Sequence, residues 1–308
     1  MSDTMKNSLD DIVRHASQII LGKDHEIRLA LTCLLARGHL LIEDQPGVGK
    51  TTLAHVLAQS LGLQYNRIQF TSDLLPADIL GVSIFNKEQG AFHFQPGPIF
   101  AELILADEVN RATPKAQSAL LEAMEEQQVT IEGETRPLPE PFFVIATQNP
   151  TYQTGTFPLP ESQLDRFLMR ISLGYPNARA ERELLAGGDR REMLKTLQTC
   201  INSKKLAELQ DAVSKIHVSD ALLDYVQALL DYSRQSPQIA TGLSPRAGLA
   251  LIHCAKAWAL MAERDHVLPE DVKIILPYVI SHRLRPVADI GEQDPAALVS
   301  LLESVPIP

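Results

Sequence analysis

The sequence has no basic excess. Its 28 lysine and arginine residues are outnumbered by 38 aspartate and glutamate residues, so the formal net charge is −10. Proteins that coat nucleic acid usually carry a positive surplus that neutralises phosphates. The charge therefore disfavours a nucleic-acid partner and leaves room only for a local basic stripe.

The sequence is also poor in cysteine and in long apolar runs. Its three cysteines, Cys33, Cys200 and Cys254, are widely spaced and form no CxxC or metal-binding pattern. We expect them in the core of a protein from a reducing compartment. Residues 1–11 lack the apolar run of a signal peptide, and no stretch approaches the roughly 20 apolar residues of a membrane helix. These absences predict no membrane span and a cytoplasmic location.

The composition is that of a folded globular protein. Apolar residues make up 45% of the chain and charged residues 21%, both near the usual values. The 308 residues are about twice a typical domain length. We therefore expect one large domain and one smaller one.

Short apolar runs alternate with amphipathic segments in the first part of the chain. The spacing predicts helices at 9–20, 51–61 and 115–126, and buried strands at 39–42, 68–70, 103–106 and 142–146. This alternation is typical of a parallel sheet with helices on both faces, so we expect an α/β domain over residues 1–176. Residues 78–97 and 129–141 interrupt the alternation and resemble hairpin insertions.

The pattern becomes helical after Tyr175-Pro176. Apolar positions recur at helical spacing in residues 206–216, 221–233, 246–263 and 269–284. We expect a helical second domain over residues 177–308.

A glycine-rich turn lies between the first predicted strand and the next helix. The residues of this turn that we expect to contact nucleotide are Gln45, Pro46, Gly47, Val48, Gly49, Lys50, Thr51 and Thr52. Gly47 and Gly49 can aim several N–H groups at one anion, and the helix adds its positive dipole end. Lys50 would reach the β- and γ-phosphates, and Thr51 would place its hydroxyl on Mg²⁺. The alternative is an ordinary surface turn, which the flanking strand and helix disfavour.

One residue of this loop departs from the usual G-x-x-x-x-G-K-[ST] pattern, which has glycine where this chain has Asp44. Aspartate tolerates left-handed backbone geometry better than most residues, so the turn can survive the change.

Two carboxylates, Asp107 and Glu108, end the apolar run Leu103-Ile104-Leu105-Ala106. Hydrolysis of a phosphoanhydride needs two acidic functions, one to hold Mg²⁺ and its water shell and one to orient or deprotonate the attacking water. We assign Asp107 to the metal and Glu108 to the water. An exposed strand end with solvated charges is the alternative.

Three further residues complete the predicted site. Asn149, which ends another apolar strand before Pro150, could bond the attacking water or the γ-phosphate, although an Asn before Pro is usually a turn residue. Arg166 could extend to a γ-phosphate in a neighbouring subunit, with Arg170 in reserve; a pair with Asp165 is the alternative.

Arg246 follows a predicted helix start, with Ser244 as N-cap and Pro245 in the first turn. A cation is unfavourable at this end of the helix dipole, which suggests that Arg246 faces an anion such as the γ-phosphate.

The ordered motifs DQPGVGKTT, LILADEVNRA, ATQNP, LPESQLDRF and LSPRA together resemble the MoxR family of AAA+ ATPases. The resemblance extends from about Gly22 to Arg285, and Ser281-His282-Arg283-Leu284-Arg285 is similar to a late segment of magnesium-chelatase ATPase subunits. Similar phosphate loops in the family also carry an acidic residue at the position of Asp44.

The resemblance implies an α/β ATPase core with a helical lid, a homo-oligomer that is usually a hexamer, and ATP sites between protomers. It carries nucleotide contact onto Lys50 and Thr51, and Mg²⁺ binding and water activation onto Asp107 and Glu108. It places a first sensor at Asn149, a finger acting on the neighbour at Arg166 and a second sensor at Arg246. The two insertions match the helix-2 and pre-sensor insertions of this clade.

Family members act as chaperone-like remodelers, often with a von Willebrand factor A domain protein as partner. The leading hypothesis is therefore an enzyme that couples ATP hydrolysis to remodelling of a partner protein or metal-cofactor complex. A slow-turnover, nucleotide-gated assembly scaffold and a nucleic-acid motor are the alternatives. Glu108 argues against the first, and the net charge and the few cations of the insertions, Lys87 and Arg136, argue against the second.

Overall fold

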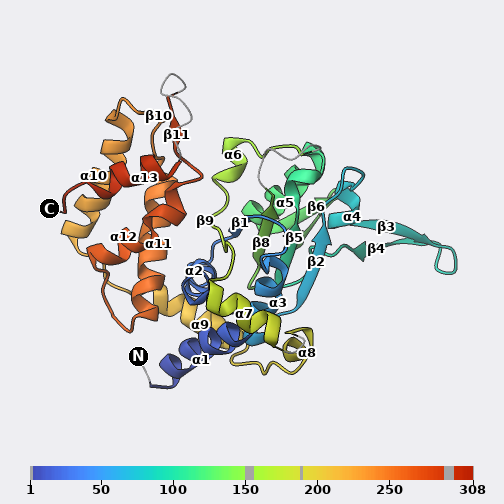
Figure 1. Cartoon of the computed structure of the whole chain (residues 1–308). Coiled ribbons are helices and arrows are strands. Elements are labelled where there is room, and N and C mark those ends of the chain that lie inside the picture. Colours follow the sequence, from blue (N-terminus) through green and yellow to red (C-terminus); the bar gives the residue numbers. More distant parts are fainter. Residues whose placement is uncertain (1–2, 150–155, 188–189, 288–294, 308) are drawn as a thin grey trace.

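A five-stranded parallel sheet forms the centre of the first half of the chain. The computed structural model describes residues 3–149, 156–187, 190–287 and 295–307 (Figure 1). The strand order is β2-β5-β8-β1-β9. The strands are β1 (Leu40–Glu43), β2 (Tyr65–Gln69), β5 (Leu103–Asp107), β8 (Phe143–Gln148) and β9 (Met169–Ile171). All pairings are parallel, so the carboxyl ends of β1, β5 and β8 lie at one edge of the sheet.

The strands are buried on both faces, as their apolar runs predict. Leu103 and Leu105 of β5 belong to one apolar core, whereas Ile104 and Ala106 belong to another on the opposite face. The first core includes α1 (Asp3–Ile19), α2 (Asp24–Leu35) and α3 (Lys50–Leu61), and it continues into the helices of the second half of the chain. α5 (Pro114–Glu126) and the short α4 (Pro76–Leu80) cover the other face. The predicted α/β architecture is confirmed.

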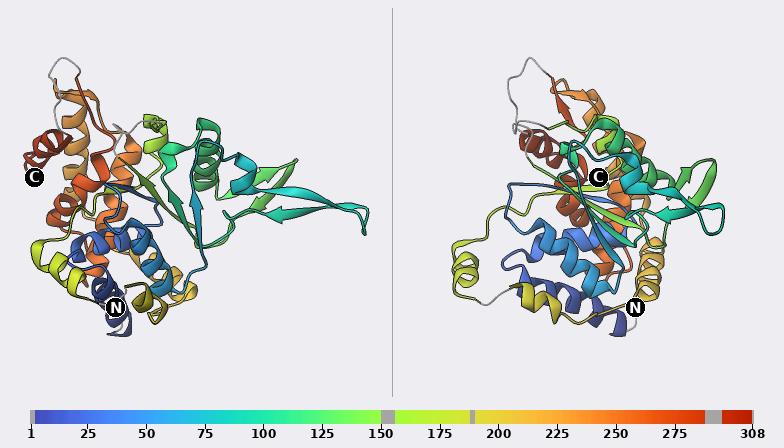
Figure 2. Two further views of the ribbon diagram at one scale, coloured as in Figure 1. Left: turned by 45° about the vertical axis from the view of Figure 1, so that its right-hand side comes forward. Right: turned by 90° about the vertical axis from the view of Figure 1, so that its right-hand side faces the viewer.

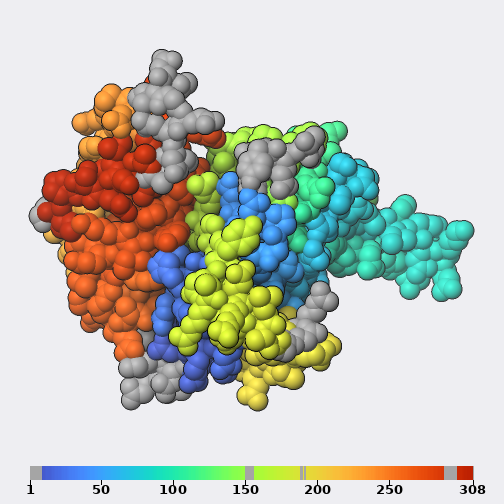
Figure 3. All heavy atoms as spheres, viewed as in Figure 1, coloured from blue at the N-terminus to red at the C-terminus, as the bar shows by residue number. Residues whose placement is uncertain are grey.

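Both insertions are antiparallel hairpins, as predicted. The strands of the first are β3 (Gly81–Asn86) and β4 (Ala91–Pro96), and those of the second are β6 (Gln128–Ile131) and β7 (Glu134–Pro137). The first hairpin projects far from the body of the protein (Figures 1, 2 and 3). The second stays close to the core because Val129 and Leu138 are buried against α5 and its neighbours.

The second half of the chain is helical, as predicted. Its helices are α9 (Ser203–Ser214), α10 (Asp220–Gln235), α11 (Pro245–Met261), α12 (Pro269–Ile280) and α13 (Pro295–Glu303). β10 (Ile239–Thr241) and β11 (Arg285–Pro286) form a small antiparallel pair beside them. Figure 1 shows this bundle on one side of the α/β core, and α9, α11 and α12 contact α2 and β9. No described helix combines the length and apolar character needed to cross a membrane.

Several elements were not predicted. They are the 3₁₀ turn Val109–Arg111, α4, α6 (Glu161–Leu164), β9, α7 (Ala178–Ala186), α8 (Arg190–Lys195), β10, β11 and α13. β9 has only three residues and Arg170 in its middle, so it has no apolar run. The prediction for the cysteines was right for Cys33 and Cys254, which are buried, but wrong for Cys200, which is partly exposed.

Candidate active site

The phosphate loop connects β1 to α3 at the carboxyl edge of the sheet. Gly47 and Gly49 have φ values of +86° and +99°, and a Cβ on either would meet no atom within 4 Å. Gly49 is also the N-cap of α3, and no side chain accepts a hydrogen bond from the first amides of that helix. The loop therefore offers an open concave surface of N–H groups and a helix N-terminus, the arrangement that binds phosphate. Pro46 and Thr51 are exposed, and Gln45, Val48 and Thr52 are half-buried.

Lys50 turns back onto this loop. Its ammonium Nζ donates to the carbonyl oxygens of Asp44 and Gln45 and, at 3.3 Å, to Oδ1 of Asn149. Burial lowers the pKa of Lys50, an effect that the nearby carboxylates of Asp44, Asp107 and Glu108 oppose. The ammonium is thus held at the carboxyl edge of the sheet among groups that stabilise its positive charge.

Asp107 is the last residue of β5 and is buried. Its Oδ1 accepts a hydrogen bond of 2.5 Å from Thr147 Oγ1, and its Oδ2 accepts from Nη2 and Nε of Arg67 at 2.6 and 3.1 Å. Arg67 lies on the neighbouring strand β2 and provides a cation beside this carboxylate. Thr147 and Arg67, two side chains that the sequence did not single out, thus orient the carboxylate.

Glu108 has a left-handed backbone, with φ +58° and ψ +48°. This conformation is uncommon for a residue other than glycine and clusters at functional sites. Its amide donates to Thr147 Oγ1 at 2.9 Å. Its carboxylate accepts from Asn149 Nδ2 at 3.1 Å and from Gln69 Nε2 and Arg111 Nη1, both at 3.0 Å. The turn therefore directs Glu108 along the carboxyl edge of the sheet rather than into either core.

Asn149 joins the two charged parts of the site. It follows β8, is buried, and uses Oδ1 to accept from Lys50 and Nδ2 to donate to Glu108. Pro150, the next residue of the ATQNP motif, lies outside the described residues. The structure thus brings together Lys50, which begins α3, Asp107 and Glu108 at the end of β5, and Asn149 at the end of β8.

A cavity of about 460 Å³ adjoins the phosphate loop. Gly47, Val48 and Gly49 line one side, and the α1–α2 turn and α7 line the others. Leu184 and Leu185 of α7 give this wall an exposed apolar character. The size and the apolar wall fit a flat aromatic base next to the phosphate site.

The two predicted arginines lie together, but at the opposite edge of the sheet. Arg166 precedes β9, which pairs with the first residues of β1, and Arg246 lies in the first turn of α11. Arg166 Nη2 is 2.9 Å from Glu125 Oε2, and Arg246 Nη2 is 2.9 Å from Glu125 Oε1. Glu125 ends α5 next to Met124, whose carbonyl contacts His39 at the start of β1. These arginines are therefore separated from the phosphate loop of their own chain by the length of β1.

The anions that lie near Arg246 in this structure are protein side chains. Besides Glu125, Asp165 Oδ2 lies 3.7 Å from Arg246 Nη1. The predicted helix start is confirmed, since Ser244 accepts from the amide of Ala247 and Pro245 begins α11. In the isolated chain, these two carboxylates of the α/β core are the anions that Arg246 faces, and its contact with a γ-phosphate stays a prediction.

The predicted alternative partner of Arg166 was also wrong, because Arg166 pairs with Glu125 rather than Asp165. Asp165 instead binds Arg283 Nε at 2.6 Å. The reserve residue, Arg170, lies within β9 and pairs with Glu43 Oε2, at the end of β1, at 3.0 Å.

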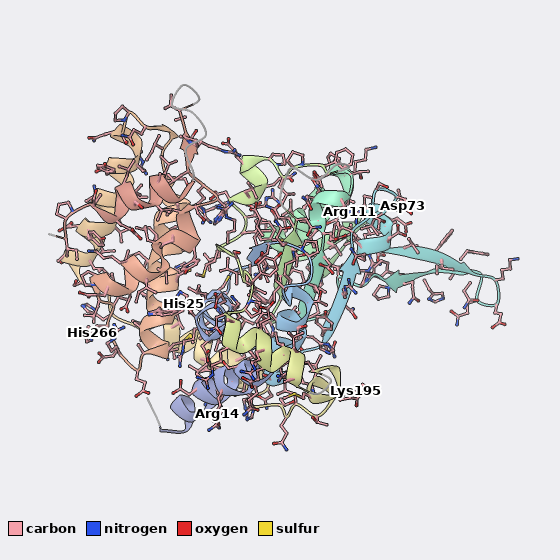
Figure 4. All side chains as sticks on the ribbon, viewed as in Figure 1. Arg14, His25, Asp73, Arg111, Lys195 and His266 are labelled. Carbon is pink, nitrogen blue, oxygen red and sulfur yellow. The ribbon has the colours of Figure 1, made fainter. Side chains whose placement is uncertain are left out.

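The residues that the sequence did not reveal are hydrogen-bond and ion-pair partners of the predicted site residues. They are Arg67, Gln69, Arg111, Glu125 and Thr147. Arg67 and Gln69 are two polar residues at a spacing of two on β2, so they point to one face of the strand. That spacing is the one local signal that could have drawn attention to them. Arg111 lies on the side of the core from which the first hairpin projects (Figure 4).

Comparison with known proteins gives the class to which this fold and site belong. The sequence pattern of the ATPase family associated with various cellular activities (AAA) matches residues 39–169, and that of the AAA lid domain matches residues 231–300. The sheet with its phosphate loop and the helical bundle therefore form an AAA ATPase core followed by its lid.

Relatives that match over most of their length identify the family within this class. The chain is 43% identical over 303 residues to the uncharacterized protein YeaC of Bacillus subtilis, covering 97% of this chain and 95% of that protein. It is 41% identical over 288 residues to Chaperone MoxR1 of Mycobacterium tuberculosis, covering 90% and 76%. The crystal structure of a candidate ATPase from Cytophaga hutchinsonii has a TM-score of 0.89 at 35% identity, covering 98% of this chain and 95% of that one. This chain belongs to the MoxR family of AAA ATPases.

Proposed function

We propose that the chain is an ATP-hydrolysing ring subunit that couples ATP hydrolysis to chaperone-like remodelling or maturation of a partner protein or metal-cofactor complex. The observation that carries the hydrolytic part is the contact chain Lys50–Asn149–Glu108. The side-chain amide of Asn149 contacts the proposed phosphate-binding ammonium of Lys50 through its oxygen and the carboxylate of Glu108 through its nitrogen. A surface turn that contains Gly-Lys-Thr by chance has no reason to lie within reach of such a pair.

Each residue has a role that its surroundings support. The loop amides and Lys50 would bind the β- and γ-phosphates, and Thr51 and Asp107 would hold Mg²⁺, which neutralises developing charge on the phosphates. Glu108 would accept the proton of the attacking water, and Asn149 would orient that water or the γ-phosphate. No cluster of three or more His, Cys, Asp or Glu residues suited to a metal occurs among the described residues. This suits Mg²⁺, which takes one or two protein ligands together with phosphates and waters.

The position of Arg166 and Arg246 supports a shared site. Both lie at the sheet edge opposite the phosphate loop of the same chain, so neither is placed to reach nucleotide bound there. In a ring built from head-to-tail contacts, each chain would present these arginines to the nucleotide of its neighbour. We propose a homo-oligomer, most simply a hexamer, in which Arg166 is the finger and Arg246 acts with it as the second sensor.

The first hairpin supports the remodelling part. Its strands expose Val82, Ile84, Phe85 and Phe92, and the last of these is 71% exposed. Apolar side chains gathered on a projecting hairpin suit contact with another protein. Together with the relationship to Chaperone MoxR1, this supports a protein client, with a von Willebrand factor A domain protein as the proposed partner.

The same hairpins disfavour a nucleic-acid motor. Arg136 of the second hairpin pairs with Glu134 and lies 4.1 Å from the centre of the Phe94 ring, so its charge is already engaged. Lys87 is then the remaining lysine or arginine in the two insertions.

We propose that the protein works in the cytoplasm. We also propose a domain boundary after residue 176, between a core of residues 1–176 and a lid of residues 177–308.

The decisive experiment replaces Glu108 with glutamine. We expect Glu108→Gln to bind ATP as the wild type does but to lose turnover by about 10²-fold or more, since the amide cannot accept the proton of water. Phosphate release and calorimetric ATP binding measure the two properties. Glu126→Gln, an exposed glutamate of α5, is the matched control. Hydrolysis that is unchanged in Glu108→Gln would remove Glu108 from the mechanism, and a wild type that binds ATP without turnover would favour the assembly scaffold.

A further inference from the structure

Asp44, the residue that replaces the usual glycine of the phosphate loop, makes a set of contacts of its own. Its side chain is buried. Oδ2 accepts from Ser172 Oγ at 2.9 Å and from the amide of Gly174 at 2.5 Å, and Oδ1 accepts from the amide of Gln45 at 2.7 Å. Asp44 has no positive φ, so the tolerance of aspartate for left-handed geometry does not explain its presence. The hydrogen bonds of its carboxylate give a better explanation of why aspartate stands at this position.

A buried negative charge at this position opposes anion binding. Burial lowers the pKa of Lys50 and the nearby carboxylate of Asp44 opposes that shift, so Asp44 interacts with the same ammonium to which the phosphates would bind. A carboxylate beside a phosphate site therefore needs a compensating role, which its three hydrogen bonds can supply.

The segment held by Asp44 leads directly into the cavity beside the loop. Gly174 is followed by Tyr175 and Pro176, which line that cavity together with Gly47 and Val48. The carbonyl of Tyr175 accepts from Lys23 Nζ at 3.0 Å, which ties the segment to the α1–α2 turn on the far side of the cavity.

The same segment also sets the position of α7. Asn177 caps this helix by accepting from the amide of Ala180. α7 then supplies the apolar wall of Leu184 and Leu185. Asp44 thus connects the phosphate loop, through residues 174–177 and α7, to the wall against which a base would pack.

We propose that Asp44 is a positioning residue that holds the base-binding wall in register with the phosphate loop, so that the nucleotide binds as one unit. The proposal rests on the proposed nucleotide site. Its consequence is that loss of the carboxylate has opposite effects on ligands with and without a base. A base-containing nucleotide loses the aligned wall, whereas a bare diphosphate loses only a repelling charge.

The test compares Mg²⁺-ADP with Mg²⁺-pyrophosphate by calorimetry, in wild type, Asp44→Asn and Ser172→Ala. Asp44→Asn should weaken ADP at least about tenfold, since charge-assisted hydrogen bonds to the wall segment are lost. Pyrophosphate affinity should stay equal or increase. Ser172→Ala keeps the charge and removes one bond, so it should weaken ADP by about threefold and leave pyrophosphate unchanged. The exposed Asp73, labelled in Figure 4, provides the control Asp73→Asn.

Other outcomes overturn the proposal. Equal losses for ADP and pyrophosphate would show a distorted loop, equal gains would show an effect of charge alone, and no change would show that the contacts do not matter. If Asp44→Asn does not fold, Ser172→Ala decides by the same comparison. ATP turnover of the wild type, measured on the same preparation, separates this failure from a failure of the proposed function.

Discussion

At the scale of residues, the site is organised by one neutral side chain. Asn149 accepts from Lys50 and donates to Glu108, so it fixes the separation of a cation and an anion that would otherwise pair directly. A neutral amide can do both because it carries a donor and an acceptor. In the proposed mechanism, nucleotide binding would draw Lys50 away from the carbonyls of its own loop, whereas the contact of Asn149 with Glu108 could persist.

Substitution of Asn149 by alanine should therefore affect turnover more than binding. We expect Asn149→Ala to lower kcat by about 10²-fold, since one oriented polar contact of the transition state is lost. The ADP affinity should change by less than about threefold, because the loop amides remain. Steady-state kinetics and calorimetry measure the two quantities, with Asn86→Ala in the hairpin turn as the control. A variant with wild-type kcat would reduce Asn149 to a structural residue.

At the scale of elements, the sequence predicted those parts whose signal is local. β1, β5 and β8 are apolar runs that end in polar residues, and parallel pairing then requires Lys50, Asp107, Glu108 and Asn149 to meet. The sequence could not predict β9, whose three residues have no apolar run, or the contacts of Asp44 and Glu125. Those contacts join residues 40 to 130 positions apart, and no spacing along the chain records them.

His39 connects three elements and should make stability depend on pH. It is buried, its Nε2 donates to the carbonyl of Met124 on α5, and its Nδ1 accepts from the amide of Val144 on β8. Burial lowers the pKa of His39 from 6.5 to about 4. Between these pH values the unfolded chain binds the proton and the folded chain does not, so stability falls as the pH falls from 6.5 towards 4.

Urea unfolding at pH 7.5 and pH 5 measures this effect. His39 should account for about 2 kcal/mol of the stability lost between the two. His39→Gln retains a donor and an acceptor but does not titrate, so its loss over the same interval should be smaller by that amount. Equal pH dependence in both proteins would show that His39 is not the group responsible.

The first hairpin should contribute little to stability despite its aromatic residues. Phe92 of the hairpin is 71% exposed, whereas Phe70, which follows β2 of the five-stranded sheet, is fully buried. We expect Phe92→Ser to lower the free energy of unfolding by less than about 1 kcal/mol and Phe70→Ala to lower it by about 3–5 kcal/mol. Denaturant titration compares the two. A large cost at Phe92 would mean that the hairpin packs against another surface in solution.

At the scale of the whole molecule, the proposed site residues of one chain lie in two separate groups. The phosphate loop lies at one edge of the sheet, and Arg166 and Arg246 lie at the other, where Glu125 pairs with both. Glu125 keeps the two arginines side by side while no phosphate is near. Assembly would then replace an internal carboxylate by the nucleotide of a neighbour.

Mixed assemblies test this division. Arg166→Ala and Lys50→Ala should each be inactive alone, but random mixing in equal amounts should restore about a quarter of the interfaces, since each variant supplies the half that the other lacks. Phosphate release across a range of mixing ratios measures the recovery. No recovery at any ratio, with mixed assembly verified by mass, would contradict a role of Arg166 on the neighbour.

The projecting hairpin acquires a further meaning when the chain is repeated around a ring. Every copy would present the same apolar pair, Phe85 and Phe92, whose ring centres lie 5.2 Å apart. A contact too weak to hold a client at one hairpin becomes strong when several hairpins engage it at once, because the later contacts form at a high effective concentration. The hairpin would then act through avidity, and release of a client would need only a change in the spacing of the hairpins rather than the loss of any single contact.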